Sequence, residues 1–312
     1  MSRRTPRLFA AALAVGALLL GGCAEKTSND TPAAGGSPAA AAFPVTVGKL
    51  TLEKRPEKIV SLSPTATEML FAVGAGKQVT AVDDQSNYPP EAPKTDLSGY
   101  QPSAEAIAGR SPDLVVLAND TNKIVDQLTT LKIPVLLTPA ATTLDDTYQQ
   151  ITDLGKLTGH PAEADAVTKK MKDDVTALTK DLPKRATKLT YYHELGPELY
   201  SATSKTFIGS IYALAGLENI ADPADADGKN AGYPQLSQEV IVRANPDFVF
   251  LADTKCCKQT PETVKARSGW AGVTAVKNNQ IVALDDDVAS RWGPRVVDLL
   301  KVIVDATAKV PA

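Results

Sequence analysis

The sequence predicts an α/β protein of two similar lobes, each built on a central and mostly parallel sheet, joined by one long rigid helix. Three observations lead to this prediction. Apolar runs of strand length alternate with amphipathic stretches of helical period, which is the pattern of βαβ units. A short motif occurs once in each half of the chain, and a long amphipathic segment lies between its two copies.

The strands are expected where short apolar runs are bounded by turn-forming residues. These runs cover residues 58–63, 79–84, 114–119 and 134–139 in the first half, and 189–194, 248–253 and 281–286 in the second. Helices are expected between them, for example over residues 65–73, 122–131 and 144–157. Because strands and helical stretches alternate, each half should form its own parallel sheet.

The repeated motif joins a short helix to the strand that follows it. Its first copy is Ser103-Ala104-Glu105-Ala106-Ile107 followed by Ser111-Pro112-Asp113-Leu114-Val115, and its second is Ser237-Gln238-Glu239-Val240-Ile241 followed by Asn245-Pro246-Asp247-Phe248-Val249. In each copy the serine is suited to cap the helix, the glutamate lies in the first turn, and Pro-Asp leads into an apolar strand. Local chemistry alone favours such a helix start and turn, but the matched order in both halves favours a repeated unit.

Residues 161–182 are expected to form one continuous helix between the two halves. Alanines, valines, leucines and Met171 recur there at helical spacing, and the other face is charged. A lone amphipathic helix of this kind usually packs on a domain surface. Its place between two α/β halves instead favours a rigid connector, which would limit closure of the lobes on each other.

The first residues have the order of an export signal. Arg3, Arg4 and Arg7 precede an apolar run over residues 8–20, which is too short to span a bilayer and ends in Leu-Gly-Gly-Cys23. This ending resembles the bacterial lipobox, in which the cysteine is lipidated and becomes the first residue. The predicted organisation is a signal peptide at 1–22, a flexible tether at 23–42, an N-terminal lobe at 43–158, a connecting helix at 159–183 and a C-terminal lobe at 184–312.

Composition argues against several classes of protein. A formal net charge of -3 without a basic cluster argues against a nucleic-acid partner. Two histidines, His160 and His193, are too few for a histidine-rich metal site. Beyond Cys23, the adjacent Cys256 and Cys257 are too few for a disulfide framework; ordinary disulfide geometry argues against a bond between neighbours, without deciding their state. No nucleophile elbow, phosphate-binding glycine loop or His-Cys cluster indicates an enzyme.

Further motifs follow one another in a specific order. They are Ile59-Val60-Ser61-Leu62-Ser63-Pro64 with Thr67-Glu68, Ser86-Asn87-Tyr88-Pro89-Pro90, Leu97-Ser98-Gly99-Tyr100, Tyr233-Pro234-Gln235-Leu236-Ser237 and Ser290-Arg291-Trp292-Gly293-Pro294-Arg295. With both copies of the repeat, they make nearly everything after the tether resemble the helical-backbone (class III) substrate-binding proteins of ABC importers for vitamin B12, ferric siderophores and haem. The resemblance implies a monomer, lipid-anchored on the extracytoplasmic face of the bacterial cell membrane, that delivers a metal chelate to permease and ATPase subunits.

The resemblance also implies a ligand site in a shallow cleft between the lobes, at the carboxyl ends of the strands. The residues assigned to this site are Ser63, Pro64, Thr65, Tyr100, Tyr233, Asp287, Arg291 and Trp292. The tyrosines suit a large conjugated ligand. Arg291 could hold an anionic group by paired hydrogen bonds, or could form a weak surface ion pair with Asp286 or Asp287.

Departures from the family pattern bear on the choice of ligand. Gln85 stands where vitamin B12-binding proteins have a tyrosine, and Leu117-Ala118-Asn119 lacks an expected tryptophan. A haem carrier would offer a tyrosine or histidine to the iron. His193 is the obvious histidine for that role, but a histidine in such a place is more often a strand or cleft-edge residue than a ligand. A ferric siderophore is therefore slightly favoured, followed by cobalamin. A haem-binding lipoprotein of the same fold and a non-transport extracellular lipoprotein are the alternatives.

Glu105 and Glu239 match a pair of family carboxylates that dock onto arginines of the importer's membrane subunits. Two exposed negative charges, one on each lobe, would orient the protein on a two-fold permease. Each glutamate is also favourable in the first turn of its helix, so the docking and capping interpretations are compatible. The resemblance implies no catalytic residue, and no metal or cofactor of the protein's own.

Overall fold

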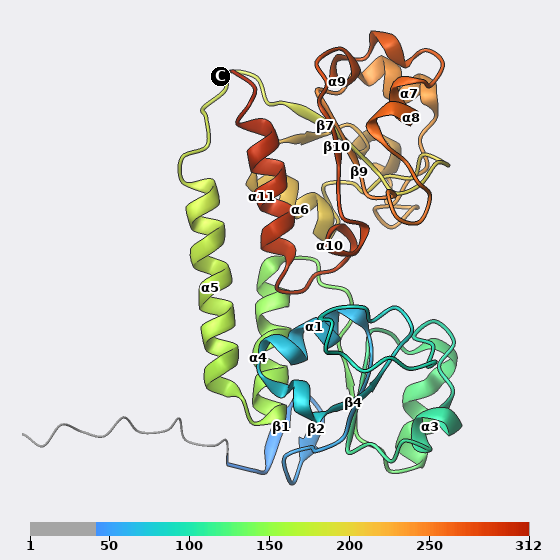
Figure 1. Cartoon of the computed structure of the whole chain (residues 1–312), viewed down its shortest axis with the longest axis vertical. Helices are drawn as coiled ribbons and strands as arrows, with labels where there is room; N and C mark the ends of the chain where they lie inside the picture. The colour runs from blue at the N-terminus through green and yellow to red at the C-terminus, as the bar shows by residue number, and fades with distance from the viewer. Residues whose placement is uncertain (1–41, 312) are drawn as a thin grey trace, which may run out of the picture. The chain divides into compact units, whose positions relative to one another are not determined.

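The computed structural model describes residues 42–311 and shows two four-stranded sheets with helices packed around them (Figure 1). All strands within these two sheets run parallel. The predicted α/β class is therefore confirmed. The expected signal peptide, the lipidation site at Cys23 and the tether up to residue 41 lie outside the described residues.

The first sheet has the strand order β4-β3-β5-β6. Its strands are β3 (Ile59–Leu62), β4 (Val79–Val82), β5 (Leu114–Leu117) and β6 (Val135–Leu137), which confirms the expected runs in slightly shorter form. Every residue of β3 and β5 is buried. Burial on both faces explains why β5 is a continuous apolar run and why β3 is apolar except for Ser61, without polar alternation.

Helices cover both faces of this sheet. The first face packs on α1 (Pro64–Ala72) and α4 (Leu144–Thr158), and the second on α2 (Ala104–Ala108) and α3 (Ile124–Thr130). An antiparallel hairpin, β1 (Val45–Val47) with β2 (Leu50–Leu52), precedes the sheet. The hairpin was not predicted, because its strands are three residues each and mix polar with apolar side chains.

The second sheet has the strand order β10-β9-β7-β8. Its strands are β7 (Thr190–Glu194), β8 (Glu218–Asn219), β9 (Phe248–Leu251) and β10 (Ile281–Ala283). The three expected strands are confirmed. The two-residue β8 was not predicted, since a strand of that length carries no readable period.

This sheet is also covered on both faces. One face packs on α6 (Phe207–Leu214) and α11 (Val296–Thr307), and the other on α7 (Gln238–Ala244), α8 (Pro261–Lys265) and α9 (Thr274–Lys277). Short 3-10 helices lie at Ala75–Gln78, Thr121–Lys123, Asp222–Asp225 and Trp270–Gly272. The remaining short helix, α10 (Asp286–Ser290), follows β10.

The long helix α5 (Pro161–Thr179) runs beside α4 and α11 (Figure 1). It ends at Thr179, three residues before the predicted boundary at residue 182. Pro183 disfavours helical backbone at residue 182 itself. Side chains of α4, α5, α6 and α11 belong to one continuous apolar cluster, which contains Leu154, Met171, Ile211 and Leu299. A shared core of this kind supports a stiff connection between the two sheets, whereas the exact lobe boundaries stay a prediction.

Both copies of the repeated motif have the predicted caps. Ser103 Oγ accepts a hydrogen bond from the backbone N–H of Ala106, and Ser237 Oγ accepts one from Val240, each at 3.3 Å. The aspartates of the Pro-Asp pairs also act alike. Asp113 Oδ2 accepts from the N–H groups of Glu57 and Lys58 beside β3, and Asp247 Oδ2 accepts from the N–H of Thr190 in β7. The repeat therefore fixes a helix and a neighbouring strand in each half.

Removing the cap of α7 should cost measurable stability. Ser237→Ala is expected to lower the free energy of unfolding by about 1 kcal/mol, because the N–H of Val240 loses its acceptor. Ser237→Asn keeps a side-chain acceptor and should stay within about 0.5 kcal/mol of the wild type. Urea unfolding followed by tryptophan fluorescence measures both variants. Equal losses in the two would show that the cap hydrogen bond contributes nothing.

Candidate functional site

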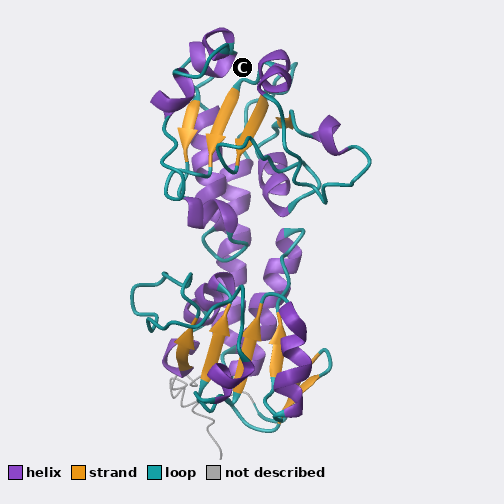
Figure 2. Ribbon diagram, turned by 90° about the vertical axis from the view of Figure 1, so that its right-hand side faces the viewer, coloured by secondary structure: helices purple, strands orange, loops and turns teal. Residues whose placement is uncertain are grey.

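The carboxyl ends of the two sheets point toward each other, as the arrowheads in Figure 2 show. A pocket of about 320 Å³ opens there, between residues that follow β3, β4 and β5 and residues of α10 and the loop after it. It is lined by Leu62, Ser63, Pro64, Thr65, Asp83, Gln85, Gly99, Tyr100, Ala118, Asn119, Asp287, Ser290, Arg291 and Trp292. Open α/β sheets bind ligands at this edge, so this pocket is the candidate site.

The turn from β3 into α1 forms one wall of the pocket. Ser63 Oγ accepts a hydrogen bond from the N–H of Ala66 at 3.2 Å, and Pro64 occupies the first turn of the helix. Both features fix the backbone at the helix start. Ser63, Pro64 and Thr65 therefore lie where they were predicted, although their role in binding stays a prediction.

A buried carboxylate that the sequence analysis missed also lies in this wall. Asp83 follows β4 and is 2% exposed. Its Oδ1 accepts a hydrogen bond from the N–H of Gln85 at 3.0 Å, whereas its Oδ2 is buried and has no hydrogen-bond partner within residues 42–311. Burial raises the pKa of this carboxyl. An aspartate at the end of a parallel strand is the sequence signal that could have identified it.

The aromatic residues assigned to the site are only partly brought together. Tyr100 lines the pocket and is 73% exposed, and Trp292 lines it from the opposite side. The indole N–H of Trp292 donates to Gln150 at 2.9 Å, which fixes the ring. Tyr233 is also exposed but does not line this pocket. It lies near the exposed Tyr200, because the N–H of Ser201 donates to the carbonyl of Pro234.

Arg291 lines the pocket, but protein acceptors already engage its terminal nitrogens. One terminal nitrogen donates to Glu68 at 2.8 Å and to Asn87 at 3.0 Å, and the other donates to the carbonyl of Gln85 at 3.0 Å and to Asp287 at 2.9 Å. The residue is 9% exposed. The expected alternative of a weak surface ion pair is therefore wrong, because the pair with Asp287 belongs to a buried network.

Glu68 of α1 is the centre of that network. Besides Arg291, it accepts hydrogen bonds from Arg295, at 2.9 Å from Nε and 2.5 Å from the terminal nitrogen. The Glu68 side chain is 2% exposed, and both arginines come from the loop between α10 and α11. The guanidinium of Arg295 also lies 4.1 Å from the ring centre of Tyr88, a cation–π contact. This ion cluster ties the first sheet's helix to the second half of the chain.

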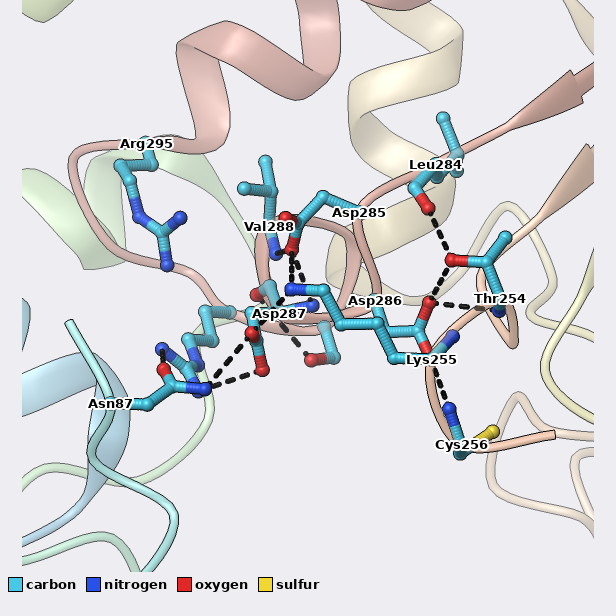
Figure 3. A network of polar contacts seen from close by, with 12 residues as sticks. Asn87, Thr254, Lys255, Cys256, Leu284, Asp285, Asp286, Asp287, Val288 and Arg295 are labelled. Carbon is cyan, nitrogen blue, oxygen red and sulfur yellow. Dashed lines mark hydrogen bonds and ion pairs between the residues drawn. The ribbon is translucent and has the colours of Figure 1, made fainter. Parts of the chain in front are cut away.

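A second polar network borders the pocket at α10 (Figure 3). The ammonium of Lys255 lies between Asp285 and Asp287, at 2.8 and 2.7 Å. Asp286 points the other way and accepts hydrogen bonds from the N–H groups of Thr254 and Cys256. The loop after β9 is therefore fixed to the start of α10, and Asp287 is shared between Lys255 and Arg291.

Comparisons with known proteins place this geometry in a family. A family model described as periplasmic binding protein matches residues 59–288. The chain belongs to this family. A substrate-binding lipoprotein of an ABC transporter from Bacillus subtilis, YvrC, itself described as uncharacterized, is 29% identical over 92% of each chain. A cobalamin-binding protein of Halobacterium salinarum is 35% identical over 83% of this chain and 73% of its own.

Solved structures agree with this assignment. The crystal structure of a possible iron-binding periplasmic solute-binding protein from Staphylococcus epidermidis superimposes with a TM-score of 0.69 and 27% identity, covering 82% of this chain and all of that one. These three relatives are named as binding proteins. Within the described range, no helix of this periplasmic binding protein has the length and apolar character needed to cross a bilayer.

Three residues singled out in the sequence, His193, Cys256 and Cys257, do not line the pocket. His193 is fully buried in β7 and shares a 2.8 Å hydrogen bond with the hydroxyl of Tyr212, so it is not at the edge of the pocket. Burial lowers its pKa to about 3. Cys256 and Cys257 are joined by a disulfide, although ordinary geometry argued against one. Their loop is fixed on both sides, by Asp286 and by the carbonyl of Asp253.

The two predicted docking glutamates of this periplasmic binding protein are both exposed. Glu105 lies in the first turn of α2 and Glu239 in the first turn of α7. Each belongs to one copy of the repeat, so each accompanies a different sheet. Their accessibility allows a partner to contact them, and their role in docking stays a prediction.

Proposed function

We propose that this periplasmic binding protein captures a metal chelate in the pocket between its two sheets and delivers it to the permease and ATPase subunits of an ABC importer. The observation that carries the proposal is the pocket itself. It lies at the carboxyl ends of a parallel sheet and faces α10 of the other half, and it contains every predicted ligand residue except Tyr233. The protein acts as a carrier rather than an enzyme, because its relatives are named as binding proteins.

The size and walls of the pocket favour a chelate that is held in part outside it. A volume of about 320 Å³ is at the small end of ligand pockets. A corrin or a ferric siderophore would fill it with one side and lay its remaining surface on exposed aromatic rings such as Tyr100. Both classes accord with the names of the cobalamin-binding and iron-binding relatives. Haem is the alternative, and His193 is too deeply buried to serve as its iron ligand.

Delivery would use the outer surface of the protein. Glu105 and Glu239 would orient the binding protein on the two-fold permease. Charges of this kind raise the rate of association more than they raise the affinity. A lipid on Cys23 and the following tether would keep the monomer on the extracytoplasmic face of the cell membrane, and the name of the B. subtilis relative supports such an anchor.

Tryptophan and tyrosine fluorescence tests the proposal on a soluble form that begins at Ala24 and contains all described residues. Cobalamin, ferric hydroxamate and catecholate siderophores, and haemin are titrated in turn. One class should quench the emission with saturation, and Tyr100→Ala should weaken its binding about tenfold, since a stacked ring contributes roughly 1 kcal/mol or more.

Leu131→Ala is the matched control for this test. It removes another exposed apolar side chain, at the end of α3 and the opposite edge of the sheet, and should leave binding unchanged. Tyr233→Ala tests whether the second predicted tyrosine reaches the bound chelate. Absence of saturable quenching by every chelate would contradict the proposal and favour a non-transport lipoprotein.

A further inference from the structure

One oxygen of a buried carboxyl group in the pocket has no hydrogen-bond partner among residues 42–311. Asp83 is 2% exposed, and its Oδ2 accepts no hydrogen bond from any residue in the range 42–311. A buried carboxylate oxygen without a hydrogen-bond donor costs folding free energy, because it has lost its hydrogen bonds to water and no protein group replaces them. The residue lies in the pocket wall, so a bound molecule is the available source of a donor.

The space beside this oxygen is kept open by a glycine. A Cβ atom at Gly99 would lie 2.9 Å from Asp83 Oδ2 and 3.3 Å from the carbonyl oxygen of Leu62. Gly99 itself lines the pocket. Any other residue at position 99 would press on the carboxylate, so the glycine preserves the approach to Asp83.

The cations around the pocket are already neutralised by protein carboxylates. Arg291 and Arg295 both donate to Glu68, and Lys255 is paired with Asp285 and Asp287. Within the described part of the chain, Asp286 accepts only from backbone N–H groups and the hydroxyl of Thr254. The local carboxylates, with Asp83 added, therefore outnumber the local cations. An anionic ligand would meet negative charge here and would find no terminal nitrogen of Arg291 that lacks an acceptor.

We propose that Asp83 is a specificity-determining residue that accepts a hydrogen bond from an N–H or O–H group of the ligand, so that the pocket selects neutral or cationic chelates bearing such donors over polyanionic ones. This inference rests on the proposed function and narrows its ligand class. A hydrogen bond to a carboxylate is stronger than one between neutral groups, and more so in a buried site. A carboxylate or catecholate oxygen placed at the same point would instead be repelled.

Two classes of chelate carry such donors: cobalamin, through the amide N–H groups on its corrin, and hydroxamate siderophores, through N–H or O–H groups. The following experiment distinguishes these two classes. The soluble form from Ala24 is titrated with cyanocobalamin, a ferric trihydroxamate that carries amide N–H groups, an anionic ferric tricatecholate and haemin. The variant is Asp83→Asn, which keeps an acceptor for the N–H of Gln85 and replaces Oδ2 by a donor. Asp84→Asn removes the adjacent, exposed carboxylate as the matched control.

The wild type should bind one of the two donor-bearing chelates at least tenfold more tightly than the tricatecholate and haemin. Asp83→Asn should weaken that chelate about tenfold and reduce or reverse the preference, whereas Asp84→Asn should leave the ratio unchanged. Thermal unfolding of each variant shows whether the variant is folded. The preference between chelates gives a second check, because a merely structural role of Asp83 would lower the affinity for all chelates alike.

The outcomes separate this inference from the proposed function. If the wild type binds a chelate but Asp83→Asn leaves the preference between classes unchanged, Asp83 does not determine specificity while the transport function stands. A wild type that prefers the polyanionic chelates also overturns the inference alone. If the wild type binds none of the chelates, the proposed function fails, and this inference fails with it.

Discussion

A Glu68→Ala variant is expected to lose about 3 to 5 kcal/mol of its free energy of unfolding, which is the usual cost of removing one partner from a buried ion cluster. The side chain of Glu68 is 2% exposed, and those of Arg291 and Arg295 are 8% and 20% exposed. Without Glu68, two guanidinium groups would remain in a poorly hydrated site with one main acceptor lost from each. The midpoint of urea unfolding, followed by tryptophan fluorescence, measures the loss.

A surface ion pair provides the matched control for Glu68. Asp96 lies 3.3 Å from Arg110, and both side chains are exposed, so Asp96→Asn should cost less than about 1 kcal/mol. A double variant, Glu68→Ala with Arg295→Ala, should be less destabilised than the sum of its single variants, because the second change removes a charge that the first left unpaired. If Glu68→Ala costs no more than Asp96→Asn, the cluster is not a stabilising tie between the halves.

The same cluster bears on how the pocket can open. Glu68 belongs to α1 of the first half, whereas Arg291 and Arg295 follow α10 of the second. A second connection is apolar, because α5 shares one continuous core with α4 and α11. Two connections of different chemistry therefore join the two sheets, and limited closure of the lobes stays a prediction. Loss of Glu68 should weaken one connection and leave the other.

The sequence predicted those parts of the fold that depend on local patterns. The strands β3 and β5 are apolar runs because both of their faces are covered, and the serine caps at Ser103 and Ser237 depend only on neighbouring residues. The place of the pocket was implied by the family resemblance, and it agrees with a general rule for parallel sheets. Elements too short to show a hydrophobic period, such as the two-residue strand β8, could not be predicted from the sequence.

The ion cluster shows why the rest of the site could not be predicted. Glu68 lies in an apolar stretch of α1 and carries no local sign that it is buried. Its partners Arg291 and Arg295 are 223 and 227 residues away along the chain. The resemblance assigned Arg291 to an anionic ligand. Only the packed structure shows that both of its terminal nitrogens donate hydrogen bonds to protein acceptors. The place of Asp83 at the end of a strand was a sequence signal, but its burial and its unpartnered oxygen are visible only in the structure.

A pair of buried carboxylates in the second half makes stability depend on pH. Glu194, at the end of β7, forms two hydrogen bonds of 2.6 Å with Arg267. Asp253, just after β9, is fully buried, and neither of its oxygens has a hydrogen-bond partner in the described part of the chain. Burial, with the negative charge of Glu194 beside it, raises the pKa of Asp253 from 3.8 to about 7. One arginine therefore faces two carboxyl groups, and Asp253 takes up the proton.

Asp253→Asn is consequently expected to stabilise the protein by about 2 kcal/mol at pH 8 and to change its stability little at pH 4. Between about pH 4 and pH 7 the folded protein keeps a proton on Asp253 that the unfolded chain has released, so the free energy of unfolding falls as the pH rises through this window. The full difference in pKa corresponds to about 4 kcal/mol, and roughly half should remain after screening by Arg267 and solvent.

Asparagine is neutral, like the protonated aspartic acid, at every pH. The free energy of unfolding of the variant should therefore lack the decrease between about pH 4 and pH 7, instead of showing it at another pH. Urea unfolding of wild type and variant at several pH values from 4 to 8 measures the slope. Asp181→Asn, which changes an exposed side chain beside Lys180, should keep the wild-type slope. Equal slopes in Asp253→Asn and the wild type would show that Asp253 is ionised in the folded protein throughout this range. Arg267 alone cannot neutralise both Glu194 and Asp253. In that case a group other than a proton on Asp253 would have to balance the second negative charge.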